Sequence, residues 1–249
     1  MRRYKRFLAD VYAPSLPLGV QEIEHELCPK GQHAFTVHCA NPGGMHGLAQ
    51  LHSRAWLYYS ENPKRKLRYS LELVESLNQA IVCVNTARAN QVIAEALNQG
   101  QIDQLTDFVF KPEVTWGQGE HKSRFDFAFY FEANKPSSLC GYIEVKSVTY
   151  APDPIQNPGL VAFPDSVTSR GLKHLEALIK VLAEGKRAIL CFCVNRNDAE
   201  QVSIAEDIDP AYGQGMRKAV DAGVEIIALK VEANCLGQQV VKILPFIFK

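Results

Sequence analysis

Hydrophobic and polar residues alternate in short runs over the first third of the chain. Such runs are typical of β-strands, because side chains that alternate along a strand point to opposite faces of a sheet. Turn-forming residues separate the runs, for example at Asn41-Pro-Gly-Gly44 and Asn62-Pro63. The runs cover residues 7–12, 34–39, 55–60 and 67–74. Several short strands at this spacing predict a small barrel or sandwich.

The pattern changes near residue 81, where longer helical runs alternate with apolar strands. One helix is predicted to begin at Asn90, as its N-cap, and to end at Gly100. A longer helix is predicted from about Ser166 to Glu184, where apolar residues recur at spacings of three and four. Further strands are predicted over residues 81–84, 108–114, 124–131, 139–148, 187–194 and 224–231, and a third helix over 210–222. This order predicts an α/β sheet with at least one parallel pair of strands.

The change of pattern predicts two domains, residues 1–80 and 81–249, with the boundary between residues 76 and 84. The chain of 249 residues is 47% hydrophobic and 22% charged, which is typical of globular proteins. It lacks an apolar run of the roughly 18 residues that a membrane span needs, so we expect no contact with a membrane. The basic N-terminus is not followed by the apolar stretch of a secretory signal, which predicts a cytoplasmic protein. The seven cysteines lack zinc-ribbon spacing and are expected to be reduced thiols.

Charge is distributed unevenly along the chain, although the net charge is zero. Residues 1–80 contain 10 Lys and Arg against 7 Asp and Glu, a net charge of +3. Residues 81–249 contain 17 against 20, a net charge of −3. The N-terminal domain is therefore the stronger candidate for contact with a polyanion.

Two apolar strands of the second domain hold acidic and basic side chains. Glu144 and Lys146 are two positions apart in one strand, so both point to the same face. Asp126 lies between two phenylalanines on the preceding strand, and a hairpin of this length can bring it beside Glu144. We therefore predict that Asp126, Glu144 and Lys146 form an acid–acid–lysine catalytic set.

Such a set suits the cleavage of a phosphodiester bond. Carboxylates can hold Mg²⁺, with Mn²⁺ as the alternative, because hard cations prefer oxygen ligands. The metal acidifies water and offsets charge on the phosphate, and the lysine can neutralise developing charge. Asp126 and Glu144 are the main predicted metal ligands, with Glu113 and Glu95 ranked below them. The alternative is an exposed cross-strand ion pair worth about 0–1 kcal/mol, but charges in a strand of buried character favour the metal site.

A second polar cluster opens the long helix. Asp165 or Ser166 is the expected N-cap. Arg170, Lys173 and His174 follow within about one turn and could contact nucleic-acid phosphates. The plainer interpretation is a capped helix with a solvated basic face, and the cluster alone favours it. Against it, cations in a first turn oppose the helix dipole.

Two segments of the first domain interleave cations with aromatic residues, a combination found in single-strand-binding barrels. The alternative is an exposed strand edge protected by its charges, and the pattern of each segment fits both equally. The occurrence of both segments in one small domain favours nucleic-acid binding. The cations are Arg3, Lys5 and Arg6 in the first segment, and Lys64, Arg65, Lys66 and Arg68 in the second.

Several motifs resemble the sugar fermentation stimulation protein A family, and they occur in the family's order over nearly the whole chain. They include Arg3-Tyr-Lys-Arg-Phe-Leu-Ala-Asp10, Asn62-Pro-Lys-Arg-Lys66, Ser123-Arg-Phe-Asp126, Glu144-Val-Lys-Ser-Val-Thr149 and Arg170-Gly-Leu-Lys-His174. The resemblance implies a small OB-type β-barrel followed by an α/β restriction-endonuclease-like domain of the PD-(D/E)xK type. It also implies non-specific DNA binding, a role in regulating sugar (maltose) metabolism, and a metal site at Asp126, Glu144 and Lys146.

The sequence is compatible with three functions. The first is a metal-dependent nuclease for DNA or RNA, and the second is a DNA-binding regulator that keeps a nuclease-like fold without turnover. The third, a small-molecule hydrolase, fares worst because the chain has no nucleophile elbow, P-loop or dinucleotide-binding motif. We expect DNA as the main partner, with RNA and a homodimer left open, and we rank DNA binding above cleavage.

Overall fold

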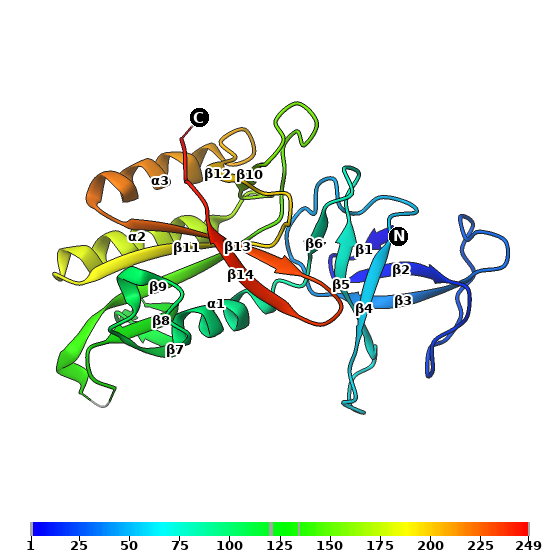
Figure 1. The fold of residues 1–249 in the computed structure, drawn as a ribbon, viewed down its shortest axis with the longest axis horizontal. Helices are drawn as coiled ribbons and strands as arrows, with labels where there is room; N and C mark the ends of the chain where they lie inside the picture. Colours follow the sequence, from blue (N-terminus) through cyan, green and yellow to red (C-terminus); the bar gives the residue numbers. More distant parts are fainter. Residues whose placement is uncertain (1, 120–121, 134, 249) are drawn as a thin grey trace.

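The computed structural model describes residues 2–119, 122–133 and 135–248, which form two domains side by side (Figure 1). The N-terminal domain is a sheet of six strands in the order β1-β2-β3-β5-β4, with β6 paired to β5. Its strands are β1 (Arg2–Tyr4), β2 (Leu8–Ala13), β3 (His33–Cys39), β4 (Ala55–Tyr59), β5 (Tyr69–Glu75) and β6 (Ile81–Cys83). Strands β3 and β5 are parallel, whereas the other pairs are antiparallel.

Every second residue of the N-terminal strands packs into one hydrophobic core. Ala9 and Val11 of β2 are buried against Phe35 and Val37 of β3 and against Leu71 of β5. The residues between them, Asp10 and Thr36, lie on the opposite face of the sheet, where Thr36 donates a hydrogen bond of 2.8 Å to the buried Asp10. Strand β6, which the sequence pattern placed at the start of the second domain, pairs with β5 of the first sheet.

The C-terminal domain is a mixed sheet of six strands in the order β14-β13-β11-β9-β8-β7. Its strands are β7 (Val109–Trp116), β8 (Ser123–Tyr130), β9 (Leu139–Val148), β11 (Arg187–Val194), β13 (Glu225–Ala233) and β14 (Gln238–Ile243). Strands β9, β11 and β13 are parallel to one another, so the predicted parallel pairing is confirmed. A separate parallel pair is formed by β10 (Leu160–Phe163) and β12 (Gln201–Ile204).

Helices cover both faces of this sheet (Figure 1). Helices α2 (Ser169–Ala183) and α3 (Pro210–Ala222) pack on one face, in a core that includes Leu178 and Tyr212. Helix α1 (Arg88–Asn98) packs on the other face through Val92, Ile93 and Leu97. Apolar burial on both faces explains the nearly continuous hydrophobic run of the central strand β11.

The helix ends differ from the prediction. Asn90 lies inside α1, whose N-cap is Ala87, instead of capping the helix. Helix α2 is capped by Thr168, whose hydroxyl accepts a hydrogen bond of 3.0 Å from the N–H of Gly171, and not by Asp165 or Ser166. The side chains of Asn90 and Asp165 do not cap these helices but form hydrogen bonds with residues that are distant in the sequence.

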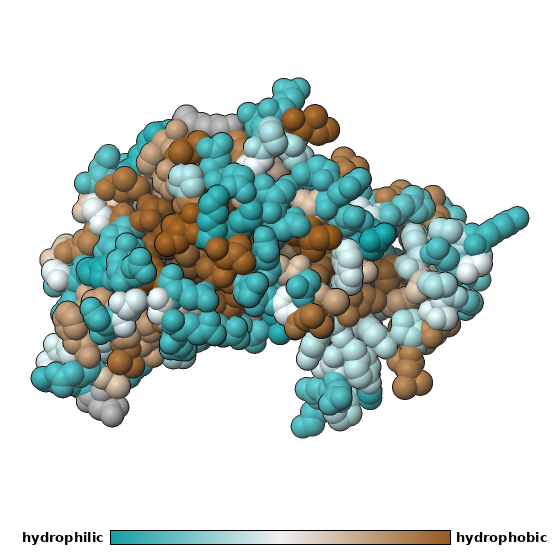
Figure 2. Space-filling model, viewed as in Figure 1, coloured by the Kyte–Doolittle hydropathy of each residue, from teal (hydrophilic) through white to brown (hydrophobic). Residues whose placement is uncertain are grey.

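Backbone contacts join the two domains. The N–H of Cys83 in β6 donates to the carbonyl of Asn195 at 3.0 Å, just beyond the end of β11. The N–H of Met45 donates to Oδ2 of Asp165 at 3.1 Å. On the face shown in Figure 2, hydrophobic residues gather on the C-terminal domain, where β14 leaves Val241 and Ile243 exposed. Among the described residues, every helix is too short or too polar to cross a membrane.

Candidate active site

Strands β8 and β9 part at the candidate site. Their ladder begins at the pair Phe127–Ile143, so Asp126 is the first β8 residue beyond it. In β9, Glu144 and Lys146 alternate with Ile143 and Val145, which pack toward α1. Glu144 is only 3% exposed and lies on the α2 side of the sheet. The fork leaves Asp126 within the electrostatic reach of Glu144 and Lys146, although Asp126 bonds to α1 and Glu144 contacts α2.

Asp126 lies against the edge of β9. Its Oδ2 accepts a hydrogen bond of 2.7 Å from the N–H of Val145, a group that β8 would otherwise pair. Its Oδ1 accepts one of 2.7 Å from Nδ2 of Asn90 on α1. Burial raises the pKa of Asp126, and the nearby charge of Glu144 raises this pKa further. A cation placed between the two carboxylates would relieve this repulsion.

Glu144 has one occupied and one open oxygen. Its Oε1 accepts a hydrogen bond of 2.7 Å from Nζ of Lys146 and contacts Nδ1 of His174. Its Oε2 is buried and has no hydrogen-bond partner among the residues that the structure describes. Burial raises the pKa of Glu144, but the hydrogen bond from His174 and the charge of Lys146 outweigh it, so this pKa is lowered overall. The residue is therefore a carboxylate with a free lone-pair site in a buried position.

Helix α2 supplies His174, which the sequence placed among surface phosphate contacts. The structure buries His174 to 8% exposure, with Nδ1 3.3 Å from Nζ of Lys146. Arg170 donates from Nε to Nε2 of His174 at 3.4 Å, while Arg170 itself and Lys173 are exposed. The i, i+4 spacing places Arg170 and His174 on the same side of α2. The sequence therefore groups His174 with the exposed Arg170, and only the packing of α2 against β9 shows that His174 is buried.

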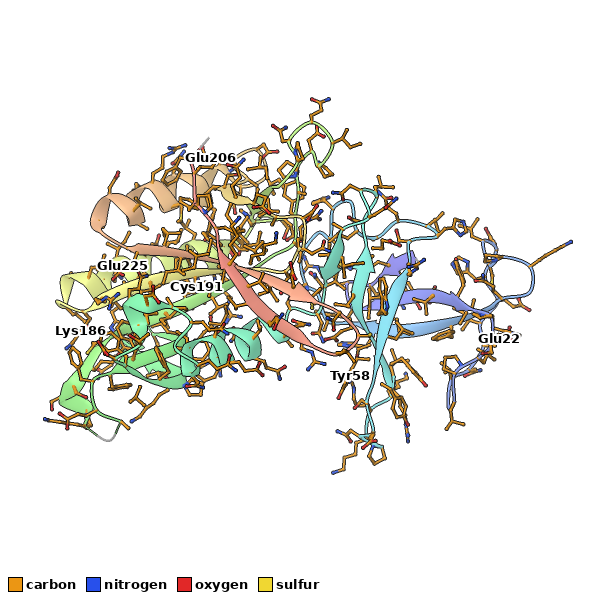
Figure 3. All side chains as sticks on the ribbon, in the orientation of Figure 1. Glu22, Tyr58, Lys186, Cys191, Glu206 and Glu225 are labelled. Atoms are coloured by element: carbon orange, nitrogen blue, oxygen red, sulfur yellow. The ribbon has the colours of Figure 1, made fainter. Side chains whose placement is uncertain are left out.

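Two predicted metal ligands lie apart from the Asp126–Glu144 pair. Glu113 is half exposed and forms an ion pair of 2.8 Å with Arg124 on the neighbouring strand. Glu95 lines a hollow between α1 and the β13–β14 hairpin, which Tyr58 of the N-terminal domain, labelled in Figure 3, also lines. Across the described residues, no three His, Cys, Asp or Glu side chains gather as a metal-binding group. The expected four-carboxylate shell is therefore reduced to two carboxylates, with Asn90 as a supporting residue that the sequence did not reveal.

The predicted cations of the N-terminal domain divide into bonded and exposed residues. Arg3 is half buried, and its Nη1 and Nη2 donate to the carbonyls of Gly44 and Asn41 at 3.2 and 2.6 Å. This arginine supports a loop, and its expected role as a phosphate contact stays a prediction. Lys5 and Arg6 are exposed in the turn between β1 and β2.

The basic segment between β4 and β5 divides in the same way. Arg65 donates from Nη2 to Oγ of Ser70 at 3.0 Å, and Arg68 from Nη1 to the hydroxyl of Tyr59 at 3.0 Å. Lys64 and Lys66 are exposed. The two lysines are therefore the side chains of this segment most open to a ligand.

A hollow of about 510 Å³, here called the interdomain hollow, opens where the two domains meet. Lys146 of the site lines it, as do Gly43 and Thr86 at the domain boundary. Arg6 and Arg170 add cationic side chains from the two domains. The candidate site is thus reached from a surface that both domains build.

Comparison with known proteins identifies both domains. The SfsA N-terminal OB domain model matches residues 1–84, and the Sugar fermentation stimulation protein RE domain model matches residues 87–236. A sugar fermentation stimulation protein homolog from Pseudomonas paraeruginosa is 39% identical over 246 residues, covering 98% of this chain and 94% of the relative. Another homolog, from Pseudomonas syringae pv. syringae, is 41% identical over 227 residues, covering 91% and 85%.

A solved structure shares the whole arrangement. It is Pyrococcus furiosus SfsA in complex with Ca²⁺, with a TM-score of 0.74 and 19% sequence identity, covering 99% of this chain and 98% of that one. At this identity the likeness concerns the fold. The predicted fold class, an OB-type domain followed by a mixed α/β domain, is confirmed.

Proposed function

The chain belongs to the sugar fermentation stimulation protein family, and from this premise we propose that it binds DNA and cleaves phosphodiester bonds with the help of a divalent metal ion. The observation that carries the proposal is the buried Glu144 carboxylate, whose Oε2 has no hydrogen-bond partner within the described part of the chain, while Lys146 bonds to its Oε1 and Asp126 feels its charge. A buried carboxylate oxygen without a donor is costly unless a cation completes its coordination.

The donor set fits a hard divalent cation. Asp126 and Glu144 would hold it through carboxylate oxygens, the ligands that Mg²⁺ and Mn²⁺ prefer. The Ca²⁺ bound to the Pyrococcus furiosus protein supports this choice, because Ca²⁺ is a hard cation as well. Such an ion supplies Lewis acidity, which acidifies water and offsets the charge of a phosphate. Two protein ligands leave room for waters and a phosphate oxygen.

The surrounding side chains have separate tasks. Lys146 holds its ammonium 2.7 Å from Glu144 Oε1, where it can also neutralise charge that develops on a phosphate. Asn90 orients Asp126 through its 2.7 Å hydrogen bond. His174 fixes Glu144 from the side of α2. Fixed dipoles and charges of this kind need no reorganisation during the reaction.

A second candidate is DNA binding without turnover, in a regulator of sugar metabolism. The relatives carry the name sugar fermentation stimulation protein homolog, which describes an effect on sugar use. Among the residues described, no three His, Cys, Asp or Glu side chains form a metal-binding group, although His174 contacts Glu144, and this also favours the candidate. Both candidates require DNA binding and differ only in cleavage.

A nicking assay separates them. Supercoiled plasmid and a labelled RNA are incubated with wild type, Lys146→Ala and Glu144→Gln, with Mg²⁺, Mn²⁺ or EDTA. We expect metal-dependent nicking by wild type and a loss of at least about 100-fold in either variant. Lys218→Ala, an exposed change on α3, serves as the control. Binding of the same plasmid with no cleavage in any metal would support the regulator, and equal cleavage by all variants would place the activity elsewhere.

A further inference from the structure

A second hollow, of about 390 Å³, lies between α2 and the β7–β8 hairpin. The floor includes Trp116, whose Nε1 donates to Oε2 of Glu184 at 3.0 Å, and Ala177 of α2. Among the described residues that line this hollow, five are cations and one, Glu176, is an acid. The charged lining residues, which define the basic hollow, are Lys122, Arg124, Arg170, Lys173, Lys180 and Glu176.

The charge of the basic hollow is opposite to that of the domain around it. Residues 81–249 have a net charge of −3, which gives no sign of a polyanion site. The fold nevertheless brings Lys122 and Arg124 at the start of β8 opposite the cations of α2. A local cluster of this kind creates a positive potential that the net charge of the domain conceals.

Two of the three α2 cations in this hollow do not stabilise their helix through its dipole, whereas Lys180, in the last turn, does. Arg170 and Lys173 lie in the first turns, where positive charge opposes the helix dipole. Arg124 has a partial counter-charge in Glu113, with a distance of 2.8 Å in an exposed pair. Cations gathered in one hollow also repel one another. A bound anion would offset both this repulsion and the unfavourable interaction of Arg170 and Lys173 with the helix dipole.

The basic hollow leads to the candidate active site. His174 lines it and also contacts Glu144 Oε1 on the inner side of α2. Arg170 lines both the basic hollow and the interdomain hollow, and Lys146 lines the latter. The two hollows therefore lie on either side of Arg170, with the acid–acid–lysine set beside their junction. This extended arrangement suits a chain of phosphates better than a single one.

We infer that the basic hollow binds the phosphates of a nucleic-acid strand on one side of the bond to be cleaved, while the strand continues into the interdomain hollow. The inference rests on the proposed function, since it assigns the path of that substrate. It adds Lys122, Arg124 and Lys180 to the predicted contacts of α2 and so extends the contact surface of the C-terminal domain. Cations facing phosphates across such a groove give affinity without sequence specificity.

The test measures DNA binding in the absence of cleavage. A fluorescent duplex of about 20 base pairs is titrated, in EDTA and at several salt concentrations, with wild type and with Lys122→Glu/Lys173→Glu. Loss of two phosphate contacts should lower the slope of log K against log salt by about 2, and affinity at low salt should fall about 10-fold or more. The matched control, Lys30→Glu/Lys218→Glu, reverses two exposed lysines outside both hollows and should bind as wild type does.

Two further measurements make the outcome specific. Lys122→Gln/Lys173→Gln should show the same change of slope with a smaller loss of affinity, which guards against misfolding of the reversed variant. Poly-glutamate at equal charge should compete poorly with DNA. Unchanged affinity and slope in both variants, or full competition by poly-glutamate, would overturn the inference. If DNA binding depends on the basic hollow but no metal supports nicking, the inference stands and the cleavage proposal fails.

Discussion

Oδ2 of Asp165, in the C-terminal domain, accepts a hydrogen bond of 3.1 Å from the backbone N–H of Met45, in the N-terminal domain. The same carboxylate packs against the backbone of Gly43, where a Cβ would lie 2.3 Å from Oδ1. Arg3 holds this loop in place through the carbonyls of Asn41 and Gly44. The contact therefore helps to set the position of the N-terminal domain beside the interdomain hollow.

Gly43→Ala should weaken this domain contact. The added methyl group cannot be accommodated unless Asp165 moves, which also removes the hydrogen bond from Met45. We expect a loss of about 1–3 kcal/mol in the free energy of unfolding and faster proteolysis between the domains. Urea denaturation and limited proteolysis measure these effects. Gly237→Ala, where the same methyl group meets no atom within 4 Å, is the control. Equal stability of the two variants would show that the loop yields without cost.

Asn90→Ala should impair the use of metal without unfolding the protein. Asn90 donates to Asp126 Oδ1 at 2.7 Å and so fixes the direction of that carboxylate. Loss of such a supporting hydrogen bond typically weakens metal affinity or activity by about 10-fold to 100-fold. The Mg²⁺ concentration that gives half-maximal nicking should rise by at least about 10-fold. Asn98→Ala, an exposed change on the same helix, should leave it unaltered, and an unaltered value in both variants would remove Asn90 from the site.

The hairpin between β4 and β5 should contribute to DNA binding through its exposed lysines. Arg65 and Arg68 are held by Ser70 and Tyr59, whereas Lys64 and Lys66 are exposed. Lys64→Gln/Lys66→Gln should reduce the salt slope of binding to duplex DNA by about 2. Fluorescence anisotropy from 50 to 300 mM salt measures the slope. A slope equal to that of wild type would exclude this hairpin from the contact surface.

The pair Asp198–Arg196 should make stability depend on pH in the acidic range. Burial raises the pKa of Asp198, but hydrogen bonds from Arg196 and Asn78 outweigh it and lower the pKa overall. The contribution of this carboxylate is therefore complete above its unfolded pKa of about 4 and is lost as the pH falls through the lower folded value. Asp198→Asn should cost about 2 kcal/mol at pH 7, since the guanidinium of Arg196 is buried and would lose its main counter-charge.

The difference between Asp198→Asn and wild type should shrink below about pH 4, because wild type then loses the same charge. Urea denaturation at pH 7, 5 and 3 gives the comparison. Glu232→Gln, at an exposed position on β13, should show no such trend. A difference that stayed constant down to pH 3 would mean that the packing of Asp198, and not its charge, carries the effect.

The pattern of polar and apolar residues predicted the structure correctly where the geometry of a single strand or helix determines which side chains share a face. The period of two in β9 placed Glu144 and Lys146 on one face, and in the structure Nζ of Lys146 lies 2.7 Å from Oε1 of Glu144. Leucines at helical spacing located α2, with Leu175 and Leu178 buried. Capping was harder to predict, because Asp165 and Asn90 are good caps by residue type but form stronger contacts with distant groups.

The sequence by itself determined the two domains, their strand-rich and mixed character, and the shared face of Glu144 and Lys146, since these follow from the periodicity of each segment. Only the tertiary structure decided that His174 turns inward to Glu144, that Arg3 supports a loop, and that Glu95 faces a different hollow. Those outcomes depend on how α1, α2 and the N-terminal sheet pack against β9 and its neighbours. Packing joins residues far apart in the chain, and no local pattern of polar and apolar positions records which of them will meet.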